Sequence, residues 1–450
     1  MRKDHVALSR ATGLGGSALI AAGGLGAGAL PVGIPFFAGG TNAQAGLVAV
    51  YCGLALLVAG WWWYGRVAPD DPWRTLALWS APLLFTPPLF SRDVYSYLAQ
   101  GQMVDAGIDV YQHGPAVLGG LIAEQIPAIW QHTPSPYGPA FLIVSELIAP
   151  PLSSHLLLGV VAMRLVAIGG LALLAVAIRT LAPAAGVGPR AAAWLVVLNP
   201  LTLIHFVGGA HNDALMVGLL AVGLAAAVRR RPVVATVLVV AAALVKAPAV
   251  LGLVAVAVIW ASQLDGRGRR MRAAATVVGT AGAATALITA AAGTGYGWLG
   301  TLSTPVSPEN WSLTSGLGRL TGHLGFWRWA GVLTVLVVAA VVWTYRAKLG
   351  PVQGLGIVLT AAVVFGPALR PWYLLWGLAP LAASVVDQGA RRVLAVVGVV
   401  LALVVLPDGY PPDQDRILLA AAGALIGLTT FAAVRLTAAL PDLRPARETR

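Results

Sequence analysis

Apolar runs long enough to cross a lipid bilayer recur along the whole chain, separated by short polar stretches. Runs of this length are typical of membrane-spanning α-helices, which need about 20 apolar residues each. The pattern therefore predicts an all-α polytopic membrane protein with about 14 transmembrane segments. The predicted segments are residues 12–36, 45–64, 74–90, 152–178, 191–209, 212–228, 232–245, 247–261, 273–292, 329–345, 352–369, 372–386, 393–406 and 416–434.

The stretch 232–261 is long for one span and short for two. Lys246 and Pro248 interrupt it, and basic clusters, RRRP and DGRGRRMR, border its two ends. Proline disrupts a helix interior because it has no N–H to donate. We therefore predict two short helices with Lys246 at their junction, which places both basic clusters on the same side of the membrane.

The composition excludes a soluble protein. Hydrophobic residues make up 58% of the chain, charged residues only 10%, and the mean hydropathy is +0.81. The single cysteine excludes an internal disulfide and a metal site built from cysteines. We predict one integral membrane domain over residues 1–450, and polar chemistry confined to a few polar clusters, since unpaired polar groups in hydrocarbon cost several kcal/mol.

The basic residues predict the orientation. The net charge is +12, and most of the 29 basic residues fall on the side of the alternating segments that holds both termini. By the positive-inside rule this side is cytoplasmic, so the excess charge requires no nucleic-acid partner. The opposite side carries the two longest loops, residues 91–151 and 293–328. We therefore predict a multi-pass plasma-membrane protein whose active site is extracytoplasmic.

The first polar cluster follows an apolar run and reads SRDVYSYLAQGQ, Ser91 to Gln102. Ser91 is a suitable N-cap, so we predict a short helix with Asp93 in its first turn, lying at the membrane surface. Asp93 is interpreted either as a helix cap paired with Arg92 or as a general base. Neighbouring side chains that could contact a substrate are Tyr95, Tyr97 and Gln100.

The second cluster is NPLTLIHFVGGAHNDALM, in which a Gly-Gly step permits an outward turn. His211, Asn212 and Asp213 follow that turn. One of them could be a helix cap, but three polar residues exceed what a cap requires, so we interpret them as part of a site. A His/Asp pair alone is weak support for a metal, because structural metal sites use three or four ligands.

Two cations occupy membrane-level positions in the other clusters. Lys246 lies inside an apolar stretch, where an anionic partner would offset its burial. Arg370 stands with Trp372 and Tyr373 in RPWYLLWG, on the side that is otherwise poor in arginine. Cations suit a lipid-linked phosphate, and aromatic and amide groups suit sugar rings. The combination indicates glycosyl transfer from a lipid carrier.

At these residues the chain resembles the GT-C class of membrane glycosyltransferases, and within it the actinobacterial polyprenol-phosphate-mannose-dependent α-1,6-mannosyltransferases of the MptA/MptB type. The resemblance rests on the order and spacing of five stretches: SRDVYSYLAQGQMVDAGIDVYQHGP, TPSPYGPAF with Tyr137, NPLTLIHFVGGAHNDALMVGLLAVGLA, VKAPAVLGL and RPWYLLWGLAPL. It implies a GT-C type bundle with extracytoplasmic active-site loops.

The resemblance also implies a reaction. Asp93 would be the catalytic base, the donor would be polyprenyl-phosphate-mannose, and the acceptor would be a lipid-anchored α-1,6 mannan of the lipomannan and lipoarabinomannan type. Lys246 would lie near the lipid phosphate. We expect no obligatory metal or other cofactor. Two alternatives are a transferase that uses another polyprenyl-phosphate sugar, such as an arabinosyl donor, and a lipid or sugar transporter, which would also have broken helices and midplane charges.

Overall fold

The computed structural model describes residues 2–29, 40–67, 71–303, 312–408, 410 and 412–439. The end of the first predicted segment, the middle of the loop 293–328 and the basic residues after 439 lie outside this part of the chain. All regular elements in the described residues are helical. The α-helices are α1 (Arg2–Ala27), α2 (Gly40–Val67), α3 (Pro72–Leu83), α4 (Asp93–Asp105), α5 (Gly120–Glu124), α6 (Ala128–Gln131), α7 (Pro139–Ile148), α8 (Leu156–Ala184), α9 (Pro189–Val196), α10 (Pro200–Thr202), α11 (Asp213–Val228), α12 (Pro232–Ala243), α13 (Gly252–Ser262), α14 (Arg269–Ala292), α15 (Leu313–Thr321), α16 (Leu324–Thr344), α17 (Arg346–Phe365), α18 (Leu374–Ser384), α19 (Gln388–Leu403) and α20 (Gln414–Ala439).

Short 3₁₀ and π elements join several of these helices. Five are 3₁₀ turns, and the sixth, η3, is π-helical. They are η1 (Pro115–Leu118), η2 (Pro150–Leu152), η3 (Leu203–Gly208), η4 (Ala247–Leu251), η5 (Gly297–Leu299) and η6 (Pro371–Tyr373). Three of them, η3, η4 and η6, interrupt apolar stretches at the polar clusters identified above.

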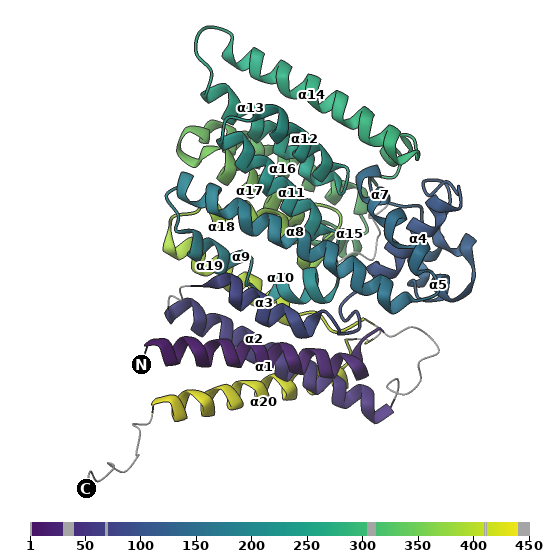
Figure 1. Ribbon diagram of the computed structural model, residues 1–450, viewed down its shortest axis with the longest axis vertical. Helices are drawn as coiled ribbons and strands as arrows, with labels where there is room; N and C mark the ends of the chain where they lie inside the picture. Colours follow the sequence, from purple (N-terminus) through teal and green to yellow (C-terminus); the bar gives the residue numbers. More distant parts are fainter. Residues whose placement is uncertain are drawn as a thin grey trace.

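The helices form a bundle with a small cluster at one end. In Figure 1, α1, α2 and α20 lie together at the bottom of the view, where α2 packs against both α1 and α20, and α14 lies at the top. The short helices α4, α5 and α7, from the loop 91–151, gather at one end of the bundle. The start of α1 and the end of α20 lie at the other end.

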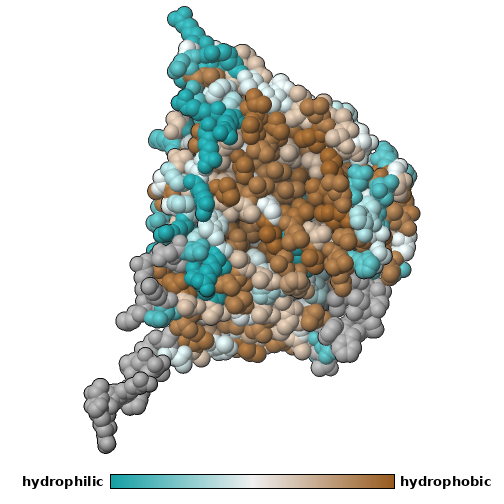
Figure 2. Space-filling model, in the orientation of Figure 1, coloured by the Kyte–Doolittle hydropathy of each residue, from teal (hydrophilic) through white to brown (hydrophobic). Residues whose placement is uncertain are grey.

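The surface of the bundle matches a protein that resides in a bilayer. Figure 2 shows a broad hydrophobic area between hydrophilic strips on two opposite edges. Many large apolar side chains on α16 are exposed, including Trp329 at 75% and Leu333 at 62%. The prediction of an all-α polytopic membrane protein is therefore confirmed.

The number of spans is not confirmed. Six described helices are long and apolar enough to cross a membrane: α2, α8, α14, α16, α17 and α20. A seventh span is possible if α9 is joined to α10 and η3 across a bend of 53°. The other seven predicted segments fold as α1 and six helices of at most 16 residues. The apolar runs correctly predicted where helices form. Several of these helices, however, are too short to span a membrane alone.

The predicted break at Lys246 is confirmed. Helix α12 ends at Ala243, η4 begins at Ala247, and α13 continues from Gly252. Lys246 itself has extended backbone angles, φ −153° and ψ 125°. The lysine side chain at this break reaches Asp213 in the second polar cluster.

Candidate active site

A cavity of about 670 Å³ opens where α4, η4 and η6 meet. Its walls combine carboxylates, cations and aromatic rings, drawn from segments that are far apart in the sequence. The predicted site residues that line it are Arg92, Asp93, Gln100, Tyr137, Lys246, Arg370, Trp372 and Tyr373. The three-dimensional fold therefore brings most of the predicted residues to one place.

Asp93 occupies the position that the sequence predicted, the first residue of α4. The Oγ of Ser91 accepts a hydrogen bond from the Asp93 amide at 3.1 Å, which satisfies one of the free N–H groups at the helix start. The carboxylate faces the cavity with 25% of its side chain exposed. Most of the rest of α4 is buried, from Val94 to Gly101, so the helix packs inside the protein rather than along its surface.

The predicted alternative in which Arg92 neutralises Asp93 is wrong. The Nε of Arg92 lies 2.8 Å from Oδ2 of Asp408, in the segment after α19. These two residues form an ion pair at the rim of the cavity, with 25% and 33% of their side chains exposed. Arg92 is therefore paired with Asp408 and does not neutralise the Asp93 carboxylate.

His211 is the group closest to the Asp93 carboxylate among the described ion-pair contacts. Its Nδ1 lies 3.5 Å from Oδ2 of Asp93. His211 is fully buried and stacks on Trp372, with ring centroids 3.9 Å apart. Burial lowers the pKa of His211 to about 3, so the imidazole is neutral near pH 7. The neutral imidazole therefore lies beside Asp93 without neutralising its charge.

The turn before α11 supplies His211, Asn212 and Asp213 together. The π-helical element η3 ends at Gly208, and Ala210 adopts a left-handed backbone with φ 54°. Left-handed angles are costly for residues other than glycine, and π-helical turns often occur at functional sites. Asn212 accepts a long hydrogen bond of 3.4 Å from the hydroxyl of Tyr97.

Lys246 forms a buried ion pair with Asp213. Its Nζ lies 2.9 Å and 2.8 Å from the two carboxylate oxygens. The indole N–H of Trp376 donates to Oδ1 of the same carboxylate at 2.6 Å, and the ring of Tyr373 lies 4.6 Å from Nζ. The anionic partner that the sequence required for Lys246 is therefore Asp213. Because its carboxylate is fully buried and holds two donors, Asp213 is poorly placed to accept a proton from a substrate.

Arg370 is the second cation on the cavity wall. It directly precedes η6, and its backbone is extended, with φ −126° and ψ 148°. Within the part of the chain that the structure describes, no carboxylate lies within ion-pair distance of Arg370. A guanidinium with no carboxylate partner among the described residues, lining the same cavity as Lys246, makes this part of the cavity suited to a phosphate.

Four of the predicted residues lie behind the cavity wall, where they support it. They are Tyr97, His211, Asn212 and Asp213, all buried. Tyr95 points elsewhere, because its hydroxyl donates to the carbonyl of Ala29 at 2.7 Å. Gln100 lines the cavity and accepts a hydrogen bond from Ser135 at 2.9 Å.

Sequence reasoning did not include Trp376 and Asp408 among the site residues. The aromatic residues of RPWYLLWG fit an interfacial belt as well as a site, so the pattern did not single out Trp376. Asp408 lies in a polar turn on the side predicted to face outward, which was a usable signal. Its partner Arg92 is 316 residues away, however, and no local pattern relates the two.

The described residues contain no group of three or more His, Cys, Asp and Glu side chains arranged to hold a metal ion. The expectation that transfer needs no metal stays a prediction.

Comparison with known proteins gives consistent matches over most of the chain. A family model for the alpha-(1->6)-mannopyranosyltransferase N-terminal domain matches residues 10–262, and one for the MptB C-terminal domain matches residues 310–435. The chain is 33% identical over 435 residues to alpha-(1->6)-mannopyranosyltransferase A of Mycobacterium tuberculosis, covering 88% of this chain and 84% of the relative. It is 31% identical over 486 residues to alpha-(1->6)-mannopyranosyltransferase B of Corynebacterium glutamicum, covering 93% of this chain and 80% of the relative.

Proposed function

The chain belongs to the alpha-(1->6)-mannopyranosyltransferase family, and we propose that it moves mannose from polyprenyl-phosphate-mannose to an α-1,6-linked mannan acceptor on the extracytoplasmic side of the membrane. The observation that carries the proposal is the cavity in which the Asp93 carboxylate shares the walls with Lys246 and Arg370. Asp93 can accept a proton, and Lys246 and Arg370 can bind a departing phosphate.

Asp93 is assigned as the general base. Its carboxylate faces the cavity and no cation neutralises it in the described structure, whereas Asp213 pairs with Lys246 and Asp408 pairs with Arg92. Asp93 removes the proton from a primary hydroxyl of the acceptor as that oxygen attacks the anomeric carbon. In-line attack on a β-linked donor inverts the configuration and gives the α linkage.

Lys246 and Arg370 form what we call the cationic wall of the cavity, and we assign it to the binding of the leaving phosphate. The bond between the anomeric carbon and the phosphate oxygen breaks as the new glycosidic bond forms, and both electrons of the broken bond stay with the phosphate. Arg370 is the better placed of the two cations, since Lys246 already has a carboxylate partner. Fixed cations at this position stabilise the charge that develops in the transition state.

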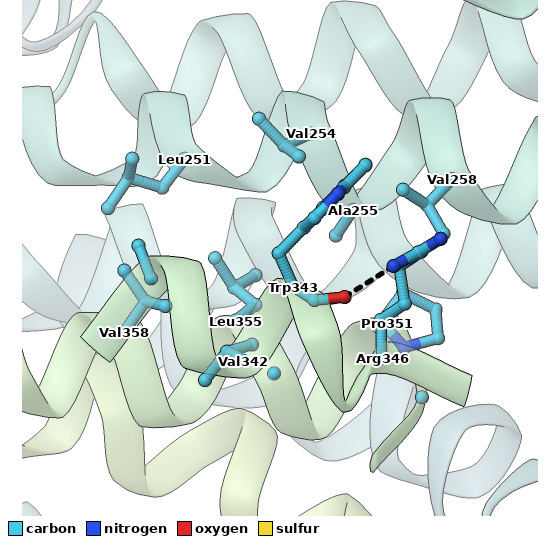
Figure 3. A pocket seen from close by; sticks show the side chains of 13 residues that line it. Leu251, Val254, Ala255, Val258, Val342, Trp343, Arg346, Pro351, Leu355 and Val358 are labelled. Atoms are coloured by element: carbon cyan, nitrogen blue, oxygen red, sulfur yellow. Dashed lines mark hydrogen bonds between the residues drawn. The ribbon is translucent and has the colours of Figure 1, made fainter. Parts of the chain in front are cut away.

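An apolar groove next to the cavity supports a lipid-linked donor. It lies between α13 on one side and α16 and α17 on the other, and has a volume of about 190 Å³. Leu251 lines both the groove and the cavity, so the two adjoin at this residue. In Figure 3, Leu251 lies at one end of the groove and Arg346, bonded to the carbonyl of Trp343, lies at the other. An isoprenoid tail fits such a surface, whereas a nucleotide does not.

Filling this groove is expected to weaken the use of long-tailed donors. Val254 lines the groove and is 55% exposed, so Val254→Trp adds bulk without displacing the core. We expect roughly a tenfold lower kcat/KM for a donor with a long isoprenoid tail, because apolar contacts along the tail are lost. Activity with a short-tailed donor should change little. Val278→Trp on α14, at a position 70% exposed, is the matched control; equal effects of both variants would show that the groove does not hold the tail.

The extracytoplasmic placement is supported by the positions of charged residues. Arg66 near the end of α2 and Arg435 near the end of α20 line one cleft, at the end of the bundle opposite α4, α5 and α7. Arginine accumulates on the cytoplasmic side of membrane proteins. The active-site cavity, which is built around α4, then faces outward.

The donor class is tested with purified protein in lipid nanodiscs. Labelled mannose is supplied on polyprenyl phosphate in one reaction and on a nucleotide in the other, with a short α-1,6-mannoside as acceptor. We expect transfer from the lipid-linked donor alone. Transfer from the nucleotide-linked donor alone would overturn the proposal.

A further inference from the structure

Arg164 is a buried cation in the first third of α8, with 1% of its surface exposed. Within the described part of the chain it has no carboxylate partner; it donates instead to two backbone carbonyls. Its Nε and Nη2 bond to the oxygen of Gly208 at 3.2 Å and 2.7 Å, and its Nη1 bonds to the oxygen of Leu84 at 2.8 Å. Burial of a charge is costly, so this arrangement calls for a reason.

The two carbonyls belong to the two chain breaks that lead into the active site. Leu84 directly follows α3, and from there the chain runs to Asp93 at the start of α4. Gly208 ends η3, and from there the chain enters the turn that carries His211 and Asp213. Carbonyls at helix ends have no intrahelical partner, so each needs a donor from outside its helix. One guanidinium supplies both.

Arginine is well suited to make this connection with one side chain. Its donors point from a rigid planar fork, so Nη1 can reach one segment while Nε and Nη2 reach another. A lysine at position 164 has a single ammonium group on a flexible stem and cannot keep the same geometry. The link also holds a turn that contains the left-handed Ala210, which would otherwise tend to relax.

We propose that Arg164 is a positioning residue: it joins the segment that delivers Asp93 to the segment that delivers His211 and Asp213, and so sets the distance between the base and the cationic wall. Its effect on the reaction rests on the proposed function. Its effect on the turn does not, because the hydrogen bonds exist whatever the substrate is.

Arg391 provides a matched control. It is also buried, at 5% exposed, and its Nη1 also donates to two backbone carbonyls, those of Ala382 at 3.0 Å and Val385 at 3.1 Å. These carbonyls lie at the end of α18, outside the cavity lining. Arg391→Lys therefore disturbs the same kind of interaction without touching the chain breaks at the active site.

The test compares Arg164→Lys with Arg391→Lys in the full-length protein. We expect faster hydrogen exchange in residues 208–213 for Arg164→Lys alone, together with a kcat lowered roughly a hundredfold and little change in the KM for donor. A purely structural role would lower the amount of folded protein in both variants and leave the kcat of the folded fraction unchanged. Unchanged exchange in residues 208–213, or the same kcat loss in both variants, would overturn the proposal.

Two further outcomes keep the test decisive. If Arg164→Lys fails to fold, Arg164→Met replaces it, because removal of a buried charge together with its donors is often tolerated; the same exchange difference is expected. If the wild-type protein transfers no mannose, the proposed function fails, and the exchange difference alone decides whether Arg164 holds the turn.

Discussion

Asp93→Asn is expected to lower mannosyl transfer by roughly 10²–10⁴-fold, the usual contribution of a positioned general base. Asparagine has nearly the same shape as aspartate but cannot accept a proton from the acceptor hydroxyl. Donor binding should remain within a few-fold of the wild type, because the phosphate contacts assigned to Lys246 and Arg370 are unchanged. The measurement is transfer of labelled mannose at saturating donor, with donor affinity determined separately.

The control for this prediction is Asp105→Asn. Asp105 is an exposed carboxylate at the end of the same helix, α4, and does not line the cavity. Its replacement changes the net charge by the same amount and should leave transfer intact. Full transfer by folded Asp93→Asn protein would remove Asp93 as the base and redirect attention to Asp408, the other carboxylate on the cavity wall.

Asp213→Asn is expected to have the second largest effect, because it leaves Lys246 buried without its counter-ion. Removal of one partner of a buried ion pair lowers the free energy of unfolding by about 3–5 kcal/mol. The indole N–H of Trp376 would also lose its charged acceptor. We expect a markedly lower melting temperature in detergent and a loss of transfer that no increase in donor concentration restores.

The double variant Asp213→Asn with Lys246→Met separates stability from catalysis. It removes the unpaired charge, so most of the stability should return. Transfer should remain low, since the cationic wall has lost one of its two members. A single variant as stable as the wild type would show that the ion pair contributes little to folding, and full transfer by the double variant would show that Lys246 does not take part in the reaction.

Much of the fold could be predicted because apolar stretches and their interruptions are local properties of the sequence. Every predicted segment except 191–209, which is divided among α9, α10 and η3, corresponds to one helix, and the predicted break at Lys246 falls two residues before Pro248. The number of spans could not be predicted in the same way. Whether a short apolar helix such as α12 crosses a membrane alone or packs beside another short helix depends on the tertiary fold.

Part of the site could also be predicted, because it too depends on local properties of the sequence. Asp93 at a helix start followed from Ser91, and an anionic partner for Lys246 followed from the cost of burying its charge. The alternative in which Arg92 pairs with Asp93 was wrong, because a local pattern offers the adjacent Asp93 and cannot indicate a residue after α19. The hydrogen bond from Tyr95 to Ala29 could not be predicted either, since it depends on where the segment after α1 lies relative to α4 in the fold.

The proposed reaction in this cavity forms an α-1,6-mannosyl linkage from a lipid-linked donor. The most direct test is linkage analysis of the product formed by purified wild-type protein in nanodiscs from polyprenyl-phosphate-mannose and a short α-1,6-mannoside. We predict an acceptor extended by α-1,6-linked mannose, and no extension by Asp93→Asn. Two results would contradict the proposed function. One is a product with a different linkage, and the other is no product from the wild type under conditions in which the Mycobacterium tuberculosis relative is active.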